Sequence, residues 1–173
     1  MKLASFEAVA KALQDADVRY LVAGGLAVIA HGHLRVTGDM DVVIQLKSDN
    51  LLSAFRALTD LGYRPTVPVT AEQFADDKQR RQWIRDKEMR VLNLYSDQHP
   101  FNSVDIFAVE PFDFDLEYEQ ALLGEISPGV SVHFVSLSTL IKMKKISNRA
   151  RDIDDIEHLE IIRGDKENND TNT

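Results

Sequence analysis

A pair of glycines followed by a pair of aspartates constrains the fold of this chain more than any other feature. Gly24 and Gly25 end the apolar run 20–23, Asp39 follows Gly25 by fourteen residues, and Asp41 comes two positions later. The apolar run predicts a buried strand, and the glycines predict a tight turn into a short helix. Asp39 and Asp41 begin a second predicted strand. Because side chains alternate along a strand, both carboxylates lie on one face.

These two features together indicate chemistry on a nucleoside triphosphate. The first N–H groups of a helix have no intrahelical partner, so the turn at Gly24 and Gly25 can hold a phosphate. Two carboxylates on one face of a strand can hold a divalent metal ion. The alternative for the glycines is structural, because a Gly-Gly pair also permits a sharp turn and close helix packing. The sequence contains neither a P-loop nor a Rossmann fingerprint.

A third carboxylate is predicted to join the pair. Asp105 lies within the apolar strand 103–109, where an unpaired buried carboxylate would be costly. A cation shared with Asp39 and Asp41 would remove that cost. The alternative is that Asp105 lies on a solvated face of the sheet. The chain has four Asp-x-Asp pairs, and only Asp39-x-Asp41 combines a strand with a preceding glycine turn.

Three carboxylates from neighbouring strands predict a site for two magnesium ions. Mg²⁺ prefers oxygen ligands and takes its remaining ligands from water and substrate phosphates; Mn²⁺ is the alternative ion. In a two-metal site one ion lowers the pKa of the attacking hydroxyl, and the other stabilises the leaving oxygens. The predicted chemistry is therefore in-line attack at a phosphorus atom.

The order of the predicted elements indicates an α/β (α+β) fold with a mixed β-sheet flanked by helices. Strands are predicted over residues 18–23, 40–46, 63–69, 91–95, 103–109 and 130–135. Helices are predicted over residues 6–14, 26–31, 51–61, 70–77, 136–147 and 151–162, and a short helix or an irregular segment over residues 114–123. The last two helices form a C-terminal helix pair, and prolines place strand 63–69 at an edge. We expect a single domain over residues 1–163 and a disordered polar tail over residues 164–173.

This pattern resembles the DNA polymerase β-like nucleotidyltransferase superfamily, and within it the AbiEii-like and other short stand-alone bacterial nucleotidyltransferases. The resemblance spans residues 18–159. It is carried by Gly24-Gly25, Arg35-x-Thr37-x-Asp39-x-Asp41, Asp105, Lys142, Lys144, Arg149, Asp152 and Asp155. It implies a nucleotidyltransferase-type sheet. It also implies transfer of a nucleoside monophosphate from a nucleoside triphosphate to an acceptor hydroxyl, with release of pyrophosphate.

The resemblance also assigns roles to individual residues. It implies metal binding and catalysis by Asp39, Asp41 and Asp105. It implies triphosphate binding by Gly24, Gly25, Thr37 and Lys144. The acceptor stays open among transfer RNA, a protein and a small molecule such as an antibiotic. The longer toxins of this group carry a further C-terminal helical region that this sequence does not contain, so acceptor recognition is not transferred.

Other functions remain open beside the enzyme. The same fold could serve as a nucleotide-binding or partner-binding module without turnover, for example in a toxin–antitoxin system with an antitoxin or a second copy as partner. The same carboxylates could also support a metal-dependent phosphohydrolase. The presence of all three carboxylates favours catalysis over a module.

Two cations near the C-terminus are predicted to face inward by their spacing to apolar residues. Lys144 continues the apolar stripe of helix 136–147, and Arg149 lies four residues before Ile153. Inward cations need partners, which are either the carboxylates Asp152 and Asp155 or a nucleotide phosphate. For Lys144 both partners remain open, whereas for Arg149 we expect a structural salt bridge.

Two further segments invite a functional interpretation. Residues 78–85 are strongly basic and contain Trp83, so they could hold an RNA backbone or stack on a base. The alternative is a solvated face with one packed aromatic side chain, which we favour. His31 and His33 form His-x-His, but further transition-metal ligands do not follow at the expected spacing. We therefore expect structural or solvent-facing histidines.

Composition limits the partners of the chain. The formal net charge is −8 over 173 residues, so the whole molecule does not attract nucleic acid, which would need a local basic patch or a bridging metal. The sequence contains no stretch that could cross a bilayer, so we expect no membrane partner. The absence of cysteine excludes disulfides and thiolate metal sites and is compatible with the cytoplasm, which we predict as the location.

Overall fold

The chain folds around a mixed seven-stranded sheet in this computed structural model, which describes residues 2–170. In space the strands follow the order β3-β4-β5-β2-β1-β7-β6. Their bounds are β1 Tyr20–Val22, β2 Asp39–Ile44, β3 Arg64–Pro65, β4 Val91–Tyr95, β5 Ser103–Phe107, β6 Leu122–Ser127 and β7 Val130–Phe134. The predicted α/β fold with a mixed sheet flanked by helices is confirmed, and β3 lies at an edge as expected.

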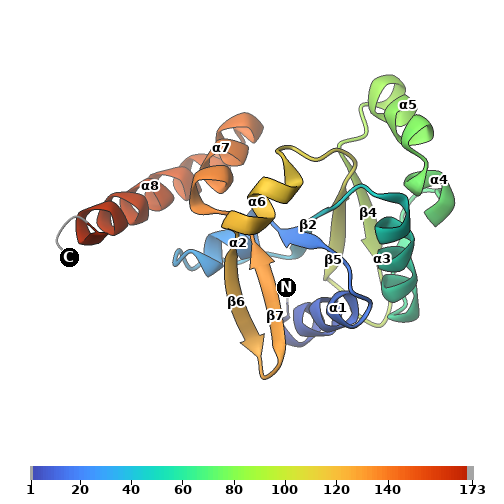
Figure 1. Cartoon of the computed structure of the whole chain (residues 1–173), viewed down its shortest axis with the longest axis horizontal. Coiled ribbons are helices and arrows are strands. Elements are labelled where there is room, and N and C mark those ends of the chain that lie inside the picture. Colours follow the sequence, from blue (N-terminus) through green and yellow to red (C-terminus); the bar gives the residue numbers. More distant parts are fainter. Residues whose placement is uncertain (1, 171–173) are drawn as a thin grey trace.

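The helices surround this sheet and end in a pair at the C-terminus. Their bounds are α1 Leu3–Asp15, α2 Gly24–Ala30, α3 Ser48–Asp60, α4 Ala71–Ala75, α5 Asp77–Lys87, α6 Phe114–Gln120, α7 Leu137–Ser147 and α8 Ala150–Asp170. Helix α1 packs against β7 and α3, and α2 packs against β2 and α7. Helices α7 and α8 pack together, and α8 projects from one end of the molecule (Figure 1). No helix within residues 2–170 combines the length and the apolar character needed to cross a membrane.

The pairing of β2 with β5 gives the sheet one polar stretch beside its core. Strand β2 runs antiparallel to β1 and parallel to β5. Met40 and Val42 of β2 are fully buried, while Asp39 and Asp41, which alternate with them along the strand, lie on the other face. This alternation follows from the two-residue period of a strand. The same period therefore builds the core and exposes a row of carboxylates.

Polar side chains begin several of the helices. The Ser136 hydroxyl accepts a hydrogen bond from the Thr139 N–H at the start of α7. Thr70 and Gln73 form a reciprocal capping box at α4. Each cap satisfies N–H groups that have no partner within the helix.

The predicted strand 63–69 is reduced to Arg64–Pro65, and the structure differs from the predicted elements at three further places. The predicted helix 114–123 stops at Gln120, and the following strand β6 pairs with β7 to form a sheet edge. The predicted helix 151–162 extends through Asp170, so residues 164–170 of the predicted disordered tail are helical. Residues 171–173 of that tail lie outside the described part of the chain.

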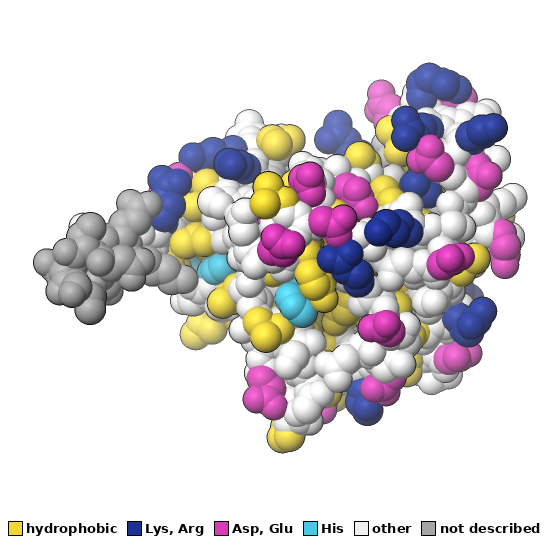
Figure 2. Space-filling view, viewed as in Figure 1, with side chains coloured by type: hydrophobic (Ala, Val, Ile, Leu, Met, Phe, Trp, Pro, Cys, Tyr) yellow, Lys and Arg dark blue, Asp and Glu magenta, His cyan; other side chains and the backbone are white. Residues whose placement is uncertain are grey.

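The basic segment is the third of these further differences, because no helix or strand is predicted over residues 78–85, which form most of helix α5. Arg80 and Trp83, three residues apart on this helix, are both buried. Asp77 lies 3.2 Å from the guanidinium of Arg80 and 2.8 Å from that of Arg81. Lys and Arg side chains gather over α5 with acidic side chains between them (Figure 2). Since Trp83 packs inward, the helix matches the interpretation as a solvated face with one packed aromatic side chain.

Candidate active site

Three carboxylates meet on the polar face of the central strands, and we call them the carboxylate cluster: Asp39, Asp41 and Asp105. In the parallel pairing of β2 with β5, Asp41 lies directly opposite Asp105. Asp39 lies opposite Ser103, whose hydroxyl donates a 2.7 Å hydrogen bond to Asp39 Oδ1. The structure therefore brings together the three aspartates that the sequence singled out.

The cluster is electrostatically unfavourable without a cation. Burial raises the pKa of Asp41, and the neighbouring charges of Asp105 and Asp39 raise it further. Burial also raises the pKa of Asp105, against the lowering effect of a hydrogen bond from Asn93. Like charges in a partly buried site favour the protonated form of each carboxyl group. Perturbed carboxylates of this kind are typical of functional sites.

The glycine turn lies directly against this cluster. Gly24 has a φ of +59°, in the left-handed region that glycine adopts most easily. A Cβ atom at Gly24 would lie 1.8 Å from Asp41 Oδ2. A Cβ atom at Gly25 would lie 2.5 Å from Thr37 Oγ1 and 2.6 Å from a terminal nitrogen of Arg35. Both glycines are therefore needed because other groups occupy the space beside them.

Substitution of Gly24 by alanine is expected to lower the Tm by about 5 °C or more and to weaken metal binding at the cluster. A left-handed non-glycine residue costs roughly 1–2 kcal/mol, and displacement of Asp41 adds to that cost. Gly129→Ala is the matched control, because Gly129 has a φ of +79° but open space around its Cβ position. Thermal unfolding and Mg²⁺ titration of both variants would measure the difference. Equal behaviour of the two variants would show that the contact with Asp41 is unimportant.

Comparison with solved structures identifies this architecture. The chain matches a crystal structure of the lincosamide antibiotic adenylyltransferase LnuA with lincomycin bound, at a TM-score of 0.56 and 15% identity over 86% of this chain and 90% of that one. It matches ANT(2")-Ia in complex with adenylyl-2"-tobramycin, at a TM-score of 0.57 and 13% identity over 94% of each chain. It also matches an antigenic nucleotidyltransferase-like protein from Paracoccidioides brasiliensis, at a TM-score of 0.59 and 17% identity over 91% of this chain and 74% of that one.

The chain has the nucleotidyltransferase fold. No protein-family model matches the sequence, and no protein of curated function matches it. The similarity to these structures therefore lies in the arrangement of the sheet and helices, because the sequences share few identical positions.

In this fold, Lys144 forms ion pairs with two carboxylates of α8. Its ammonium group lies 2.8 Å from Asp152 Oδ1 and 2.7 Å from Asp155 Oδ2. Asp155 is fully buried and also lies 3.2 Å from Arg35 Nε. The contacts of Asp155 lack hydrogen-bond geometry, so the attraction there is chiefly Coulombic. Of the two partners left open for Lys144, the structure forms the carboxylate pair.

Arg149 is placed differently from the prediction. We expected it to form a structural salt bridge, yet within residues 2–170 no carboxylate lies in ion-pair contact with its exposed guanidinium. Lys144 takes the carboxylates instead, because both of them lie on the inner side of α8. Against the dominant effect of burial, the charges of Lys144 and Arg149 both lower the pKa of Asp41, and that of Arg149 also lowers the pKa of Asp105. Arg149 therefore acts on the carboxylate cluster, as Lys144 does.

The donor set of the cluster fits a magnesium ion. All three side chains offer carboxylate oxygens, and their mutual repulsion is the electrostatic strain that a divalent cation removes. Thr37 lies beside the cluster, with its hydroxyl 3.4 Å from the Asp39 carbonyl oxygen. Residues Arg35 and Thr37 also line a groove of about 700 Å³ between α1, α2 and β6, which is otherwise mostly apolar.

Two residues that hydrogen-bond to the carboxylates and hold them in place were not predicted from the sequence. Asn93 of β4 lies opposite Asp105, and its amide donates a 2.6 Å hydrogen bond to Asp105 Oδ1. Ser103 makes the corresponding bond to Asp39. The signal in the sequence was that Asn93 is a polar residue inside the predicted strand 91–95, just as Asp105 is a polar residue inside the predicted strand 103–109. These bonds fix the direction in which each carboxylate faces.

Proposed function

We propose that this protein is a metal-dependent nucleotidyltransferase that moves a nucleoside monophosphate from a nucleoside triphosphate to an acceptor hydroxyl. The observation that carries the proposal is the in-register pairing of Asp41 with Asp105 beside the turn at Gly24. It joins an all-oxygen ligand set to backbone N–H groups that can face a phosphate. The shared fold with known adenylyltransferases supports the same conclusion and favours ATP as the donor.

The residues divide the work between metal, phosphate and acceptor. Asp39, Asp41 and Asp105 would hold two Mg²⁺ ions. Bound ions of this kind lower the pKa of an attacking hydroxyl and stabilise the leaving pyrophosphate. Asn93 keeps Asp105 oriented toward Asp41 through its 2.6 Å hydrogen bond. The acceptor hydroxyl attacks the α-phosphorus atom as the bond to the pyrophosphate oxygen breaks, and its proton passes to Asp105 or to water.

The phosphate chain would lie between the glycine turn and the C-terminal helix pair. Gly24 and Gly25 offer backbone N–H groups there, and Thr37 offers a hydroxyl beside Gly25. Arg149 supplies an exposed guanidinium whose charge already acts on the cluster. We assign phosphate neutralisation mainly to Arg149, because the ammonium group of Lys144 is buried between two carboxylates. Lys144 then supports the site by holding α8 in place.

Arg149→Ala is expected to raise the KM for the nucleoside triphosphate about 10- to 100-fold with little change in Tm. A charge-assisted hydrogen bond contributes about 1.5–3 kcal/mol, which corresponds to that range of affinity. We expect the Tm to stay the same because, among residues 2–170, the guanidinium has no ion-pair partner to lose. Arg151→Ala is the matched control, since Arg151 is an exposed arginine two positions away. Steady-state kinetics at saturating Mg²⁺ would compare the two, and equal KM values would remove Arg149 from the site.

The acceptor is proposed to be a small molecule that carries hydroxyl groups. The fold neighbours include a lincosamide adenylyltransferase with lincomycin bound and a complex with an adenylylated tobramycin. The net charge of −8 argues against a large polyanion such as transfer RNA as the acceptor. The AbiEii-like grouping and a toxin–antitoxin role with an antitoxin partner stay predictions from the sequence.

The direct test is transfer of label from each of four α-labelled triphosphates. The protein is incubated with Mg²⁺ or Mn²⁺, with a panel of hydroxylated antibiotics, transfer RNA and cell extract. We expect one labelled small molecule and stoichiometric pyrophosphate, both dependent on the metal. Labelled nucleoside monophosphate without any labelled acceptor would instead indicate a phosphohydrolase. Calorimetric binding of triphosphate with no pyrophosphate released would indicate a binding module.

A further inference from the structure

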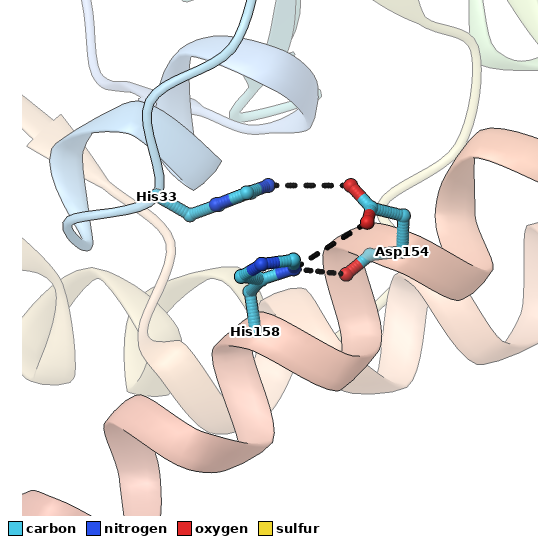
Figure 3. A group of neighbouring side chains, drawn as sticks. All are labelled: His33, Asp154 and His158. Carbon is cyan, nitrogen blue, oxygen red and sulfur yellow. Dashed lines mark hydrogen bonds and ion pairs between the residues drawn. The ribbon is translucent and has the colours of Figure 1, made fainter.

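A second group of metal-ligand side chains lies where the loop after α2 meets α8, and we call it the histidine cluster: His33, Asp154 and His158. His33 comes from the loop, whereas Asp154 and His158 stand one turn apart on α8. The two imidazole rings are stacked, with centroids 3.9 Å apart and planes 15° apart. Both rings direct a nitrogen toward Asp154, as Figure 3 shows.

The ligand atoms are nearly at metal-binding distances. His33 Nε2 lies 3.4 Å from Asp154 Oδ2, and His158 Nδ1 lies 3.5 Å from Asp154 Oδ1. One ligand atom from each side chain falls within 4.8 Å of the other two. Tetrahedral bonds of about 2.0–2.1 Å place ligand atoms roughly 3.3 Å apart. The two contacts are near that spacing but reach different oxygens of Asp154. Rotation of the three side chains would bring a single oxygen within reach of both nitrogens, because the ligand atoms already lie within 4.8 Å of one another.

The backbones that carry the cluster are held independently of it. The His33 N–H donates to the Val28 carbonyl at 3.2 Å, which fixes the loop to the end of α2. Gly32 before it has a φ of +114°, and a Cβ there would lie 3.8 Å from Ile162 Cδ1 of α8. The buried contact between Arg35 and Asp155 joins the same loop to the same helix. The three ligands are therefore brought together by packing that does not depend on an ion.

The chemistry of these ligands separates the cluster from the carboxylate cluster. Imidazole nitrogens suit Zn²⁺, Ni²⁺, Co²⁺ and Cu²⁺, whereas Mg²⁺ prefers oxygen ligands. His31, the other member of the His-x-His motif, is buried with its Nε2 against the Val135 carbonyl oxygen at 2.8 Å. The His-x-His motif therefore contributes one ligand, His33. Helix α8 supplies the other two, Asp154 and His158, which lie too far along the sequence to be recognised from the spacing of the motif.

We propose that the histidine cluster binds one transition-metal ion of the Zn²⁺ type and thereby joins the loop after α2 to α8. His33 Nε2, His158 Nδ1 and one Asp154 oxygen form three protein ligands, which leave a position open for water or another ligand. His158 gives up the 2.9 Å hydrogen bond from Nδ1 to the Asp154 carbonyl oxygen and carries its proton on Nε2. The site is distinct from the carboxylate cluster, and its occupancy does not depend on the proposed transfer reaction.

The test is a Co²⁺ titration of the full chain without an affinity tag. Four- or five-coordinate Co²⁺ absorbs strongly in the visible range, whereas six-coordinate Co²⁺ bound by oxygen atoms absorbs weakly. We expect one equivalent of the strong signal, its displacement by Zn²⁺, and its loss in His33→Ala, Asp154→Asn and His158→Ala. A Zn²⁺-dependent rise in Tm of about 5 °C should be lost in the same variants.

Two control variants make the result decisive. His133→Ala removes a histidine on β7 that stacks on Tyr118 and should keep the signal. Asp41→Asn removes a ligand of the carboxylate cluster and should also keep it. Absence of the strong signal in the unmodified protein, its persistence in His33→Ala, or its loss in Asp41→Asn would each overturn the proposal. Tm values measured with a chelator confirm that each variant is folded.

Discussion

Replacing Asp41 with asparagine is expected to reduce nucleotide transfer by about 10³-fold or more. A bound ion contributes several kcal/mol of transition-state charge stabilisation, and each 1.36 kcal/mol corresponds to about a tenfold change in rate. Asparagine has nearly the shape of aspartate, so it fits beside Gly24 without a new steric conflict. Asp41 is partly buried and pairs in register with Asp105, so a water-bridged substitute ligand has little room. Single-turnover transfer of label from an α-labelled triphosphate would measure the loss.

The same substitution is expected to raise the Tm of the ion-free protein. Burial and the charges of Asp105 and Asp39 hold the pKa of Asp41 above the ordinary value of 3.8. The folded state therefore binds more protons than the unfolded chain between the unfolded and folded pKa values. Across that window the free energy of unfolding falls as pH rises, and the loss is complete above the raised pKa of the folded state. Asparagine cannot ionise, so the variant lacks this loss, and Mg²⁺ stabilises it less than the unmodified protein.

The control for both measurements is Asp60→Asn, which removes one negative charge from the exposed end of α3. It should keep full transfer and show no rise in Tm at low ionic strength beyond a general charge effect. Transfer by Asp41→Asn within tenfold of the unmodified protein would exclude Asp41 as a metal ligand. A lower Tm in Asp41→Asn without metal would exclude the repulsion described for the carboxylate cluster.

Replacing Asp155 with asparagine is expected to destabilise the protein by about 3–5 kcal/mol, because it removes a buried charge that pairs with both Arg35 and Lys144 and leaves Lys144 with Asp152 alone. Asp155 is fully buried, and it contacts Arg35 at 3.2 Å and Lys144 at 2.7 Å. A change of this size lowers the Tm of a chain of this length by roughly 10 °C. Since Arg35 also lies over Gly25, the triphosphate KM should rise in the same variant. Denaturant unfolding and kinetics below the lowered Tm would measure both effects.

Glu157→Gln is the matched control for Asp155, because Glu157 lies on the exposed face of the same helix. Exposed charges of this kind contribute about 0–1 kcal/mol. If both variants unfold at the same denaturant concentration, the buried pairs contribute nothing to the attachment of α8. A stable Asp155→Asn variant with an unchanged KM would separate Arg35 from the phosphate side of the site.

The carboxylate cluster could be predicted because its residues follow the simplest rule in the sequence. Asp39 and Asp41 share a face through the two-residue period of a strand, and Asp105 interrupts an apolar strand. What the period does not give is register, because strand pairing is set by the packing of the whole sheet. The partnership of Asn93 with Asp105 and of Ser103 with Asp39 therefore came only from the structure.

The C-terminal cations show a second limit of sequence reasoning. The sequence predicts inward positions for both Lys144 and Arg149, and Asp152 and Asp155 are close to both in sequence. Which cation takes which carboxylate depends on the angle at which α8 returns across α7, and local periodicity does not encode that angle. His33 shows the same limit over a longer span, since its partner Asp154 lies 121 positions away.

Parallel pairing of β2 with β5 has a consequence for the order in which the protein is made. Asp39 and Ser103 are 64 positions apart, and strands β3 and β4 lie between β2 and β5 in sequence. Contacts over such separations form slowly, because a long loop must close before they stabilise the chain. A nascent chain that ends before residue 103 therefore carries two of the three aspartates but no ion-binding site. The mutually repelling carboxylates of Asp41 and Asp105 are therefore brought together only after strands β1 to β5 have been synthesised.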